Sequence, residues 1–436
     1  MGLITFKKGH IGANLSAHNS FKSFIIFVFM LLMTTSGAMA EVIDGLNYDL
    51  NSETKTATLL PKQDDKYSGD IVVPEKVKGN DGVEYVVTSL GNGCFSSCEG
   101  LTSITIPSSV TSLGNSCFYS CEGLTSITIP SSVISLGYYC FRECKGLTSI
   151  TIPSSVTSLS RGCFFDCHGL TSVTIPSSVT SLGDYCFDGC TRLPSITIPS
   201  SVTSLGKGCF SYCRRLTSIT IPSSVTSLGR GCFDSCSGLT SITIPSSVTS
   251  LGDECFFSCE GLTSITIPSS VTSLGFRCFS FCTRLASITI PSSVTSLGEY
   301  CFFSCNSLKR MYFEGAKPEK ISDALIFEKC RIYVPAEYLQ DYKNALGSQY
   351  RYIYSWDPNN PETNINQATT RGIVASAHDG IVSISGLDNG EVVKFYAADG
   401  KLIGSSSAVD GTASCAVSET MVIAKFGGNA IKVAVK

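Results

Sequence analysis

One pattern of apolar and polar positions recurs every 23 residues through the middle of the chain. Ten leucines mark it, from Leu101 to Leu308, and nine full copies fill residues 101–307. With few exceptions a copy reads Leu-Thr-Ser-Ile-Thr-Ile-Pro-Ser-Ser-Val-Thr-Ser-Leu-Gly, then two variable residues, Cys-Phe, two variable residues, Cys and two final residues. A fixed period of this length predicts a solenoid, in which each copy forms one coil stacked on the next.

The first copy, residues 101–123, shows which elements the pattern predicts. Leu101, Ile104 and Ile106 fit the inward positions of a short strand, and the hydroxyl side chains between them alternate outward. Pro107 then ends the strand, because its nitrogen has no hydrogen to donate to a ladder.

The second half of a copy is expected to turn and to form a short helical segment. Gly114 can take a positive φ at a corner. Cys117, Phe118 and Cys121 follow at i, i+1 and i+4, a spacing that places them on one face of a short helix. Since the phenylalanine recurs in every copy, a continuous aromatic column is expected along the axis.

The array at 91–307 needs a cap at each end. A single copy buries too little apolar surface to offset the conformational entropy lost on ordering, so coils must stack and the outermost ones must be covered. Residues 41–90 form the predicted N-terminal cap, in which the segment 71–74 imitates Ile-Thr-Ile-Pro. Residues 308–356 form the predicted C-terminal cap, with a helix near 337–346.

The chain changes character after the array. Residues 357–370 are polar and rich in Asn and Pro, as in a linker. Residues 371–436 contain short alternating strands separated by turn signals, which predicts a small β-sandwich. The expected strands are Val382–Ile384, Glu391–Tyr396, Lys401–Ile403, Met421–Phe426 and Ile431–Val435.

The repeated string resembles that of the BspA-like leucine-rich-repeat surface proteins of bacteria. The likeness spans residues 48–353, approximately, and the ending Ile-Tyr-Val-Pro-Ala at 332–336 resembles their usual C-terminal cap. One departure is systematic, because the first cysteine of each copy stands where alanine is common. The resemblance implies a leucine-rich-repeat solenoid at the bacterial cell surface that adheres to host matrix or mucosal glycoproteins, to glycans or to other cells.

The C-terminal domain resembles the sorting domain of type IX secretion. The resembling stretches are Val-Lys-Phe-Tyr at 393–396, Asp-Gly-Lys at 399–401 and the chain end. The sorting motif would consist of Lys432, Val433, Val435 and Lys436. This resemblance implies passage through the outer membrane and contact with secretion and anchoring machinery, while an ordinary accessory β-domain remains the alternative.

Residues 1–40 indicate an export signal. Basic residues precede a run of ten apolar ones, and Ala38-Met39-Ala40 provides the small-x-small pattern of a cleavage site. Ten apolar residues are too few to span a bilayer comfortably, which argues against a retained membrane anchor. We expect cleavage between Ala40 and Glu41, and a mature chain that is exported.

Twenty of the 22 cysteines belong to the repeated Cys-Phe-x-x-Cys pairs. Metal ligation is one interpretation, but desolvation beside the phenylalanine opposes thiolates. Disulfides between coils are a second, although a cysteine with two equivalent neighbours can bond to only one. The sequence favours free, buried thiols that act as small hydrophobic side chains.

Composition and motifs argue against an enzyme and against nucleic acid as a partner. Only 15 % of residues are charged, the net charge is −3, and no basic cluster follows the signal. Downstream of the signal only His168 and His378 are histidines, and neither belongs to a catalytic constellation. No cofactor motif or metal motif is present.

The strand half of every copy, residues 101–114 and their equivalents, is uncharged. We therefore predict a ligand face of outward hydroxyl groups, beginning with Ser103, Thr105, Ser126, Thr128, Ser149 and Thr151. Such a ladder suits a repetitive ligand, such as a polysaccharide or a glycosylated matrix protein. Recent duplication alone would also leave identical strands. A structural spacer, or an ice- or mineral-binding ladder, are the alternative functions.

Variation between copies is concentrated in the slots that flank the cysteines. Several slots hold tyrosines, which are candidate contact residues for a protein partner. They are Tyr119, Tyr138, Tyr139, Tyr185, Tyr212 and Tyr300. The simpler interpretation is that these rings cover neighbouring apolar surface.

Overall fold

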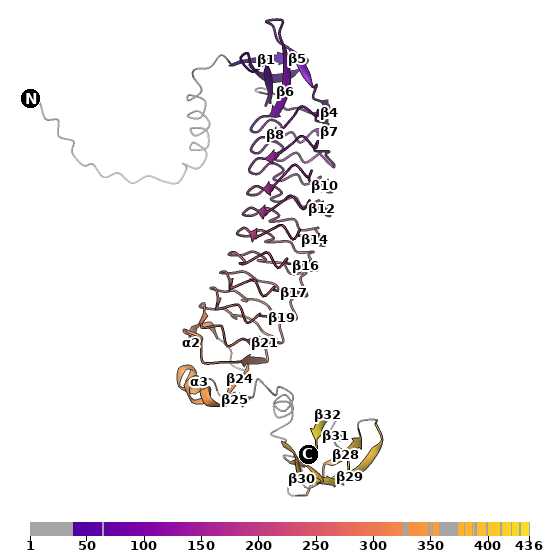
Figure 1. Ribbon diagram of the computed structural model, residues 1–436, viewed down its shortest axis with the longest axis vertical. Helices are drawn as coiled ribbons and strands as arrows, with labels where there is room; N and C mark the ends of the chain where they lie inside the picture. The colour runs from indigo at the N-terminus through magenta and orange to yellow at the C-terminus, as the bar shows by residue number, and fades with distance from the viewer. Residues whose placement is uncertain are drawn as a thin grey trace, which may run out of the picture.

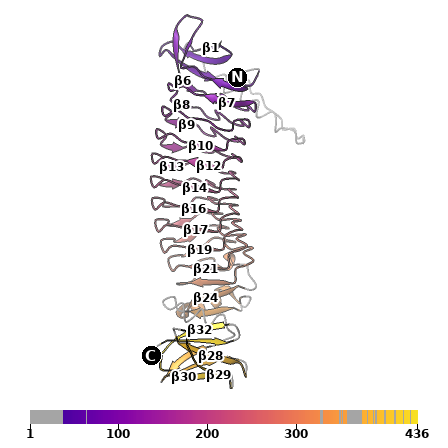
Figure 2. The same ribbon diagram turned by 90° about the vertical axis from the view of Figure 1, so that its right-hand side faces the viewer.

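The computed structural model describes residues 38–62, 65–325, 330–347, 350 and 352–356, and in the C-terminal region residues 374–378, 380–385, 387, 390–397, 400–409, 412–419, 421–426 and 429–435. Most of the predicted export signal and the predicted linker lie outside these residues. The main body is a long column of stacked coils (Figure 1). A view turned by 90° shows the coils following one another in chain order along the column (Figure 2). The predicted repeat solenoid is confirmed.

Two rows of short parallel strands run along the column, and they join equivalent residues of successive coils, as between Ile196 and Ile219. The Ser-Ile-Thr row comprises β4 (Gly69–Val72), β7 (Leu101–Thr105), β10 (Ser149–Thr151), β12 (Ser172–Thr174), β14 (Ser195–Thr197), β16 (Ser218–Thr220), β17 (Ser241–Thr243), β19 (Ser264–Thr266) and β21 (Ser287–Ile290). The Ser-Leu row comprises β6 (Glu84–Leu90), β8 (Ser112–Leu113), β9 (Ser135–Leu136), β11 (Ser158–Leu159), β13 (Ser181–Leu182), β15 (Ser204–Leu205), β18 (Ser250–Leu251), β20 (Ser273–Leu274) and β22 (Ser296–Leu297).

The segment around each cysteine pair is a series of tight turns, not the predicted short helix. In the first such segment the N–H groups of Cys94 and Cys98 bond back within their own coil, whereas those of Gly93, Phe95 and Ser97 donate to the next coil. Gly93 and Ser97 have φ values of 62° and 57°, in the left-handed region. In a helix, the N–H groups would donate to carbonyl oxygens of the same segment. The alternation instead shares them between coils.

A glycine follows every Ser-Leu strand except β11, which is followed by Ser160, and its role is steric and does not depend on a positive φ. Gly114 is not among the glycines with positive φ. A Cβ atom at Gly114 would lie 2.5 Å from the carbonyl carbon of Gly91, and one at Gly137 would lie 2.4 Å from the amide nitrogen of Asn115. Glycine is therefore required because the backbones of successive coils nearly touch.

The core of the column is a stack of phenylalanine rings, as predicted. From Phe95 to Phe302 the ring centroids are 5.3–5.7 Å apart and the planes lie within 8° of parallel. The second cysteine of nine coils donates its Sγ–H to the phenylalanine carbonyl oxygen of the preceding coil, from Cys121 to Cys305, at 3.0–3.3 Å. All twenty paired cysteines are free and buried.

Hydroxyl groups also join the coils. Ser132 Oγ donates to the carbonyl oxygen of Val110 at 2.6 Å, and the bond recurs down the array to Ser293, which donates to Val271. Threonine adds a similar bond between coils, as from Thr180 Oγ1 to a carbonyl oxygen of the preceding coil. Much of the Ser/Thr repetition thus has a structural explanation, since these hydroxyls satisfy backbone carbonyl groups.

The N-terminal cap extends the Ser-Leu row with β1 (Ala38–Ile43), β2 (Leu46–Asn51), β3 (Thr56–Leu60) and β5 (Lys76–Lys78). The predicted imitation of the repeat is confirmed, because Ile71 pairs with Ile104. Ala40 and Glu41 lie within β1, opposite Asp49 and Tyr48. Cleavage between Ala40 and Glu41 remains a prediction, and it would leave the last three residues of β1 in place.

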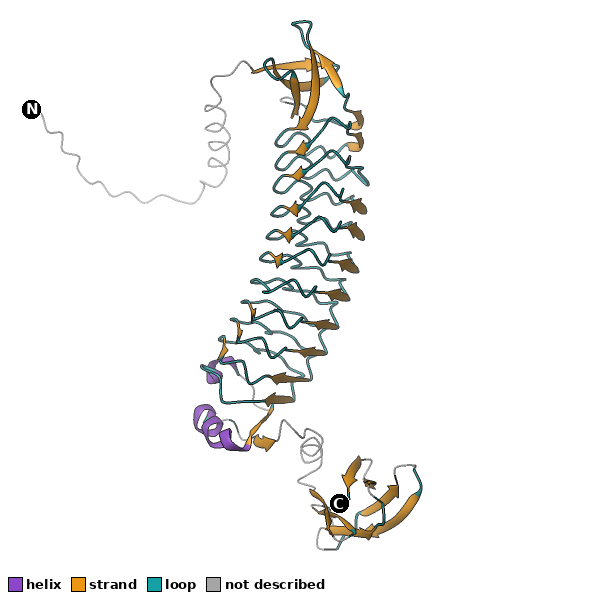
Figure 3. Cartoon of the chain, viewed as in Figure 1, coloured by secondary structure: helices purple, strands orange, loops and turns teal. Residues whose placement is uncertain are grey.

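The C-terminal cap extends the Ser-Ile-Thr row with β23 (Arg310–Phe313), β24 (Arg331–Pro335) and β25 (Ile353–Trp356), covered by α2 (Ile321–Ala324), η1 (Ala336–Tyr338) and α3 (Leu339–Leu346) (Figure 3). The helix expected near 337–346 is therefore present. Tyr342 of α3 is fully buried and donates its hydroxyl to the carbonyl oxygen of Gly315 at 3.1 Å. This bond ties the helix to the end of the array.

The C-terminal region forms two antiparallel sheets around their own core, which confirms the predicted small β-domain. One sheet has the order β26-β27-β30 and the other β29-β28-β31-β32. Their bounds are β26 (Val374–His378), β27 (Ile381–Ser385), β28 (Val392–Ala397), β29 (Leu402–Ser407), β30 (Thr412–Ala416), β31 (Met421–Phe426) and β32 (Asn429–Ala434). β26 and β30 were not predicted. Among the described residues there is no helix of the length and apolarity that a membrane span needs.

Candidate functional site

The predicted ligand face lies on the outer side of the Ser-Ile-Thr row. We call it the hydroxyl face, and its six named members are all exposed: Ser103, Thr105, Ser126, Thr128, Ser149 and Thr151. Ser103 donates to Asp70 Oδ1 at 2.6 Å, which closes the N-terminal end of the face. No side-chain hydrogen bond to a described residue occupies the other five hydroxyls. These groups are available to a ligand, unlike the hydroxyls that join the coils.

The hydroxyl face is hollowed at its N-terminal half. A shallow depression of about 390 Å³ is lined by both apolar and hydroxyl groups, namely Ser126, Ile127, Thr128, Ile129, Ser149, Ile150, Thr151 and Pro153. Residues 124–130 are not paired as a strand in this coil. The depression therefore lies where the row of strands is interrupted, and four predicted ligand-face residues line it.

Tyrosines continue the hydroxyl face into the C-terminal cap, and the sequence reasoning missed them. The strand register places Tyr312 beside Thr289, then Tyr333 beside Tyr312 and Tyr354 beside Tyr333. The first two rings stack with centroids 4.8 Å apart, and the second two with centroids 5.5 Å apart. The threonine column of the face thus ends in three stacked rings, of which Tyr354 is exposed, Tyr312 is half-buried and Tyr333 is buried. A register of 21 residues between β23 and β24, in place of 23, concealed this alignment.

The candidate contact tyrosines on the variable face differ in exposure. Tyr138, Tyr212 and Tyr300 are exposed, by 57, 43 and 39 %. The other three, Tyr119, Tyr139 and Tyr185, are half-buried. The guanidinium of Arg142 lies over both Tyr119 and Tyr139, so these two rings are engaged within the coil stack. The six tyrosines do not converge on one site.

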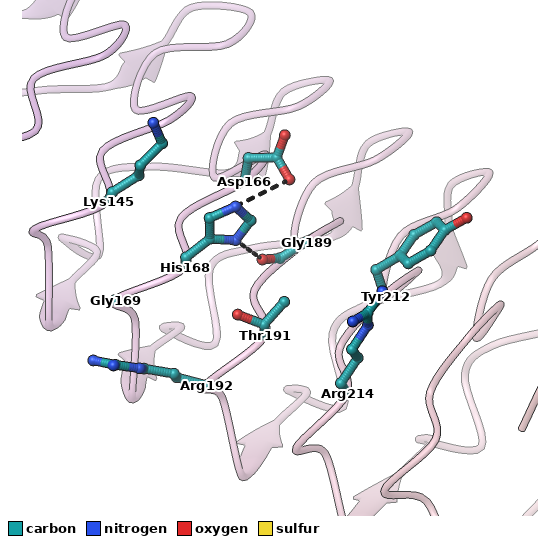
Figure 4. A pocket seen from close by; sticks show the side chains of 9 residues that line it. All are labelled: Lys145, Asp166, His168, Gly169, Gly189, Thr191, Arg192, Tyr212 and Arg214. Carbon is teal, nitrogen blue, oxygen red and sulfur yellow. Dashed lines mark hydrogen bonds and ion pairs between the residues drawn. The ribbon is translucent and has the colours of Figure 1, made fainter. Parts of the chain in front are cut away.

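A second hollow lies on the side of the column where the segments after the second cysteines meet. We call it the corner pocket. Its volume is about 660 Å³, and Figure 4 shows its lining residues, namely Lys145, Asp166, His168, Gly169, Gly189, Thr191, Arg192, Tyr212 and Arg214. They come from four successive coils. Of these residues, the sequence analysis had singled out Tyr212 and His168, but had not placed them together.

Positive charge predominates in the corner pocket. Lys145 pairs with Glu122, which lies outside the lining. Arg214 lies over the ring of Tyr212 at 5.8 Å, and Arg192 has no ion pair or side-chain hydrogen bond to any described residue. Three cationic side chains therefore face a hollow that contains one acidic residue, Asp166.

The carboxyl groups next to the pocket are partly shielded from water. Burial raises the pKa of Asp166, against the lowering effect of His168. Burial, together with the charges of Asp166 and Asp234, also raises the pKa of Asp188 to about 7. The two segments are joined because the N–H of Asp166 donates to the Asp188 carbonyl oxygen at 2.7 Å. The local negative charge is thus weaker than the residue types suggest.

The corner pocket coincides with a change in the repeated sequence. In most copies the second cysteine is followed by one variable residue and then Gly-Leu-Thr, but residues 192–194 read Arg-Leu-Pro. In neighbouring coils the N–H at the position of Pro194 donates to the previous coil, as from Thr171 to Thr148. Proline has no N–H to donate. Accordingly β12 and β14 are not paired, and the pocket lies beside this interruption.

The surroundings of His168 do not indicate catalysis. Its Nδ1–H donates to the Gly189 carbonyl oxygen at 2.8 Å, and Nε2 lies 3.9 Å from Asp166 Oδ1. In the described part of the chain no nucleophilic side chain is hydrogen-bonded to this ring. The adjacent Cys167 is buried and bonded to the Phe141 carbonyl oxygen. The side chain of the other histidine, His378, lies outside the described residues.

The repeated cysteines form a structural column and not a reactive site. Burial raises the pKa of thiols such as Cys140 and Cys186 well above the ordinary value. Across the described residues no group of three or more Cys, His, Asp or Glu side chains is arranged to hold a metal ion. The geometry therefore offers two surfaces for binding, the hydroxyl face and the corner pocket.

Comparison with known proteins identifies the repeat. A family model described as the BspA type leucine rich repeat region (6 copies) matches residues 88–217 and 204–333, which together exceed half of the chain. No curated protein matches the chain significantly.

Several solved structures are similar. A leucine-rich repeat protein from Bacteroides ovatus has 26 % identity and a TM-score of 0.50, over 67 % of this chain and 78 % of that one. A leucine rich cell surface protein from Faecalibacterium prausnitzii has 28 % identity and a TM-score of 0.45, over 75 % and 97 %. The pneumococcal vaccine antigen PcpA has 18 % identity and a TM-score of 0.49, over 74 % and 100 %.

Proposed function

The chain belongs to the BspA-type leucine-rich-repeat proteins, and from this premise we propose that it is an exported surface adhesin of a bacterium. Its partners are host matrix or mucosal glycoproteins, glycans or other cells, which it holds through the extended repeat surface. The single observation that carries this proposal is the hydroxyl face. From β7 to β21 it repeats one pair of hydroxyls coil after coil, with no charge in the strands.

The structure gives the hydroxyl face a property that duplication alone does not require. Other repeated hydroxyls, such as that of Ser132, are used to join coils, whereas Ser126, Thr128, Ser149 and Thr151 have no side-chain partner among the described residues. Exposed, unpaired hydroxyls next to apolar strand residues suit a ligand rich in hydroxyl groups. Adjacent pairs lie about 4.8 Å apart along the row. A long ligand would therefore meet equivalent groups in every coil.

A charge-insertion experiment tests the hydroxyl face. Replacing Ser126, Ser149 and Ser172 with lysine places three charges on the face, in three successive coils. A matched control places lysine at Ser131, Ser154 and Ser177, which are exposed serines of the same coils that lie beyond the strands. Adhesion to mucin-coated or matrix-coated surfaces should be lost in the first variant and kept in the control. Equal adhesion by both folded variants would contradict the role of the hydroxyl face.

The C-terminal domain supports export in the same proposal. We assign residues 371–436 to sorting by type IX secretion, with Lys432 exposed and Val433 buried on β32, the last strand of its sheet. Lys436 lies outside the described residues. Removing residues 371–436 should retain the protein inside the outer membrane, which fractionation of cells measures. Unchanged surface display would show that this domain is an accessory one.

A further inference from the structure

The corner pocket differs in chemistry from the hydroxyl face that runs along the same coils. Its cations, Lys145, Arg192 and Arg214, surround the side chains of Thr191 and Asp166 and the exposed ring of Tyr212. Its volume lies within the range of about 300–1,000 Å³ typical of small-ligand sites. We propose that the corner pocket binds one acidic group of a saccharide, a sulfate ester or a carboxylate. This inference rests on the proposed adhesive function and specifies part of its ligand.

One cation of the corner pocket, Arg192, is free to bind an anion. Arg192 has no ion pair with any described residue, and the partner of Arg214 is a ring and not a carboxylate. A planar guanidinium can hold a carboxylate or a sulfate through two parallel hydrogen bonds. Bound anions would therefore displace water from Arg192 without breaking an existing ion pair.

Glutamates in the coils on either side of the corner pocket limit the length of an anion that can bind there. The residue after the second cysteine is Glu99 and then Glu122 in the coils before Lys145, and it is Glu260 beyond the pocket. A long polyanion lying along the column would meet these carboxylates. A single acidic group held at Arg192 avoids them, because Glu122 and Glu260 each stand three coils away, about 14 Å at about 4.8 Å per coil, and surface charges are screened beyond about 8–10 Å.

The other lining groups favour a sugar over an acidic peptide. Asp166 is a carboxylate acceptor inside the cationic pocket, and the Thr191 hydroxyl can both donate and accept. A sugar ring supplies hydroxyl donors for these acceptors, while the exposed face of Tyr212 offers an apolar surface for its C–H groups. An aspartate- or glutamate-rich peptide carries several carboxylates, and those that extend past the pocket would meet Glu122 or Glu260.

Arg192 also stands at a repeat position that is glycine in six other coils and Arg or Ser in three. The equivalent residues in six other coils are Gly100, Gly123, Gly146, Gly169, Gly238 and Gly261. At Gly169 a Cβ atom would lie 2.2 Å from the Lys145 carbonyl oxygen. At position 192 the chain instead places a long cationic side chain, beside the junction at which β12 and β14 are unpaired.

The test measures binding of the full chain to three trisaccharides with a common backbone: one neutral, one with a single sulfate and one with a terminal carboxylate sugar. A pentapeptide of aspartate provides the protein-like arm, and isothermal titration gives each affinity. The acidic sugars should bind at least about tenfold more tightly than the neutral one, as a hydrogen bond to a charged group implies. The sulfate and carboxylate arms identify which acid the pocket prefers.

Matched variants assign the binding to the pocket. Arg192→Gly restores the residue of six other coils, and Arg214→Ser copies Ser237 of the next coil, so both should fold. Each should weaken binding of the preferred acidic sugar by about tenfold. The control is Arg284→Gly, because Cys-Thr-Arg-Leu at 282–285 repeats the sequence at 190–193 outside the pocket. This control should bind as the unaltered chain does.

Three results would overturn the inference: equal affinity for neutral and acidic sugars, equal weakening by Arg284→Gly, or tightest binding of the peptide. In each case adhesion of the chain to mucin or matrix would still stand. Failure of the proposed function gives a different result, in which no cell, glycan or glycoprotein surface retains the chain.

Discussion

The second cysteine of each pair is bonded and buried at the same time. Cys144, for example, has no exposed surface, and its Sγ donates to the Phe118 carbonyl oxygen at 3.0 Å. That carbonyl oxygen already accepts the N–H of Cys121 at 3.3 Å, and the thiol gives it a second donor. A thiol is small enough for the space and is still a weak donor. This explains a cysteine in a position that apolar packing alone would fill with alanine or valine.

The buried thiols lead to a prediction about reactivity. All 22 cysteines are free, and only Cys415 is partly exposed. Because the thiolate is the reactive form, and burial raises the pKa of the repeat thiols, these groups should not react in the folded chain. At pH 8 a disulfide reagent should modify about one thiol per native chain, and about 22 after denaturation. Rapid native labelling of several repeat cysteines would contradict this packing.

Asp188 predicts an unusual pH dependence of stability. Its pKa is raised to about 7 by burial and by the charges of Asp166 and Asp234, so the folded chain binds a proton that the unfolded chain releases near pH 4. The free energy of unfolding should then decrease as the pH rises from about 4 to 7. Asp188→Asn removes this dependence and should stabilise the chain by about 1–2 kcal/mol at pH 8.

Urea unfolding followed by circular dichroism, at pH 4.5 and at pH 8, measures this difference. Nearly equal midpoints are expected for Asp188→Asn and the unaltered chain at the lower pH, and a higher midpoint for the variant at pH 8. Parallel pH profiles would mean that the Asp188 carboxyl has an ordinary pKa in the folded chain.

At the residue scale, the sequence predicts which side chains are exposed better than it predicts which exposed side chains lie together in a site. The alternation of apolar and hydroxyl residues correctly placed Ser103 and Thr105 outside and Ile104 inside. The corner pocket was not predicted, since its lining comes from four coils whose variable residues look unrelated when read along the chain. Writing the copies in register shows Lys145, His168, Thr191 and Arg214 in one column. The depth of the hollow is visible only in three dimensions.

At the scale of elements, the turns around the cysteine pairs are what bind coil to coil on that side. Their left-handed residues include non-glycines such as Ser120, Tyr139 and Tyr212. A left-handed non-glycine residue costs about 1–2 kcal/mol, and here its own N–H donates to the neighbouring coil, as from Ser120 to the Arg142 carbonyl oxygen. The i, i+4 spacing indicated a helix because a periodicity argument considers one chain segment alone. Such an argument does not consider hydrogen bonds between segments of different coils.

Two glycines at the same repeat position should respond differently to alanine. A Cβ atom at Gly137 would lie 2.4 Å from backbone, whereas at Gly229 the nearest atom would be 3.5 Å away, and neither has a positive φ. Gly137→Ala should therefore destabilise the chain by about 1–3 kcal/mol. Gly229→Ala should be close to neutral. Thermal unfolding of both variants checks the difference, and equal losses would indicate that the glycines act through flexibility.

The C-terminal domain shows where strand prediction succeeds and fails. β31 was predicted with the bounds Met421–Phe426 that it has, because apolar residues mark it clearly. β30 was missed because its sequence, Thr-Ala-Ser-Cys-Ala, contains only small residues. It is a strand because it pairs with β27 along five residues. Tertiary pairing supplies what the local sequence does not indicate.

At the scale of the whole molecule, the column is stable only if its ends are covered. The last full coil has Phe302 and Leu297 buried, and β21 is paired with β23 of the cap. Uncovering this coil would expose an aromatic ring and an open strand edge together. Such surfaces promote association between chains.

Two truncations test the need for the cap. A chain that ends at residue 356 keeps the cap and should remain monomeric, with the circular dichroism spectrum of the intact solenoid. A chain that ends at residue 307 lacks β23, β24, β25 and α3 and should aggregate or lose stability. Size-exclusion chromatography with light scattering distinguishes them. A monomeric, equally stable shorter chain would show that the coils cap themselves.

The strict pairing of equivalent residues allows the number of coils to change between generations. Each coil meets its neighbours through the same atoms, so coding segments that are almost identical can recombine to add or remove one unit without creating a new interface. Each such event would change the reach of the protein by about 4.8 Å. Descendants could thus differ in how far their outermost coil stands from the cell, while the contacts within every coil stay the same.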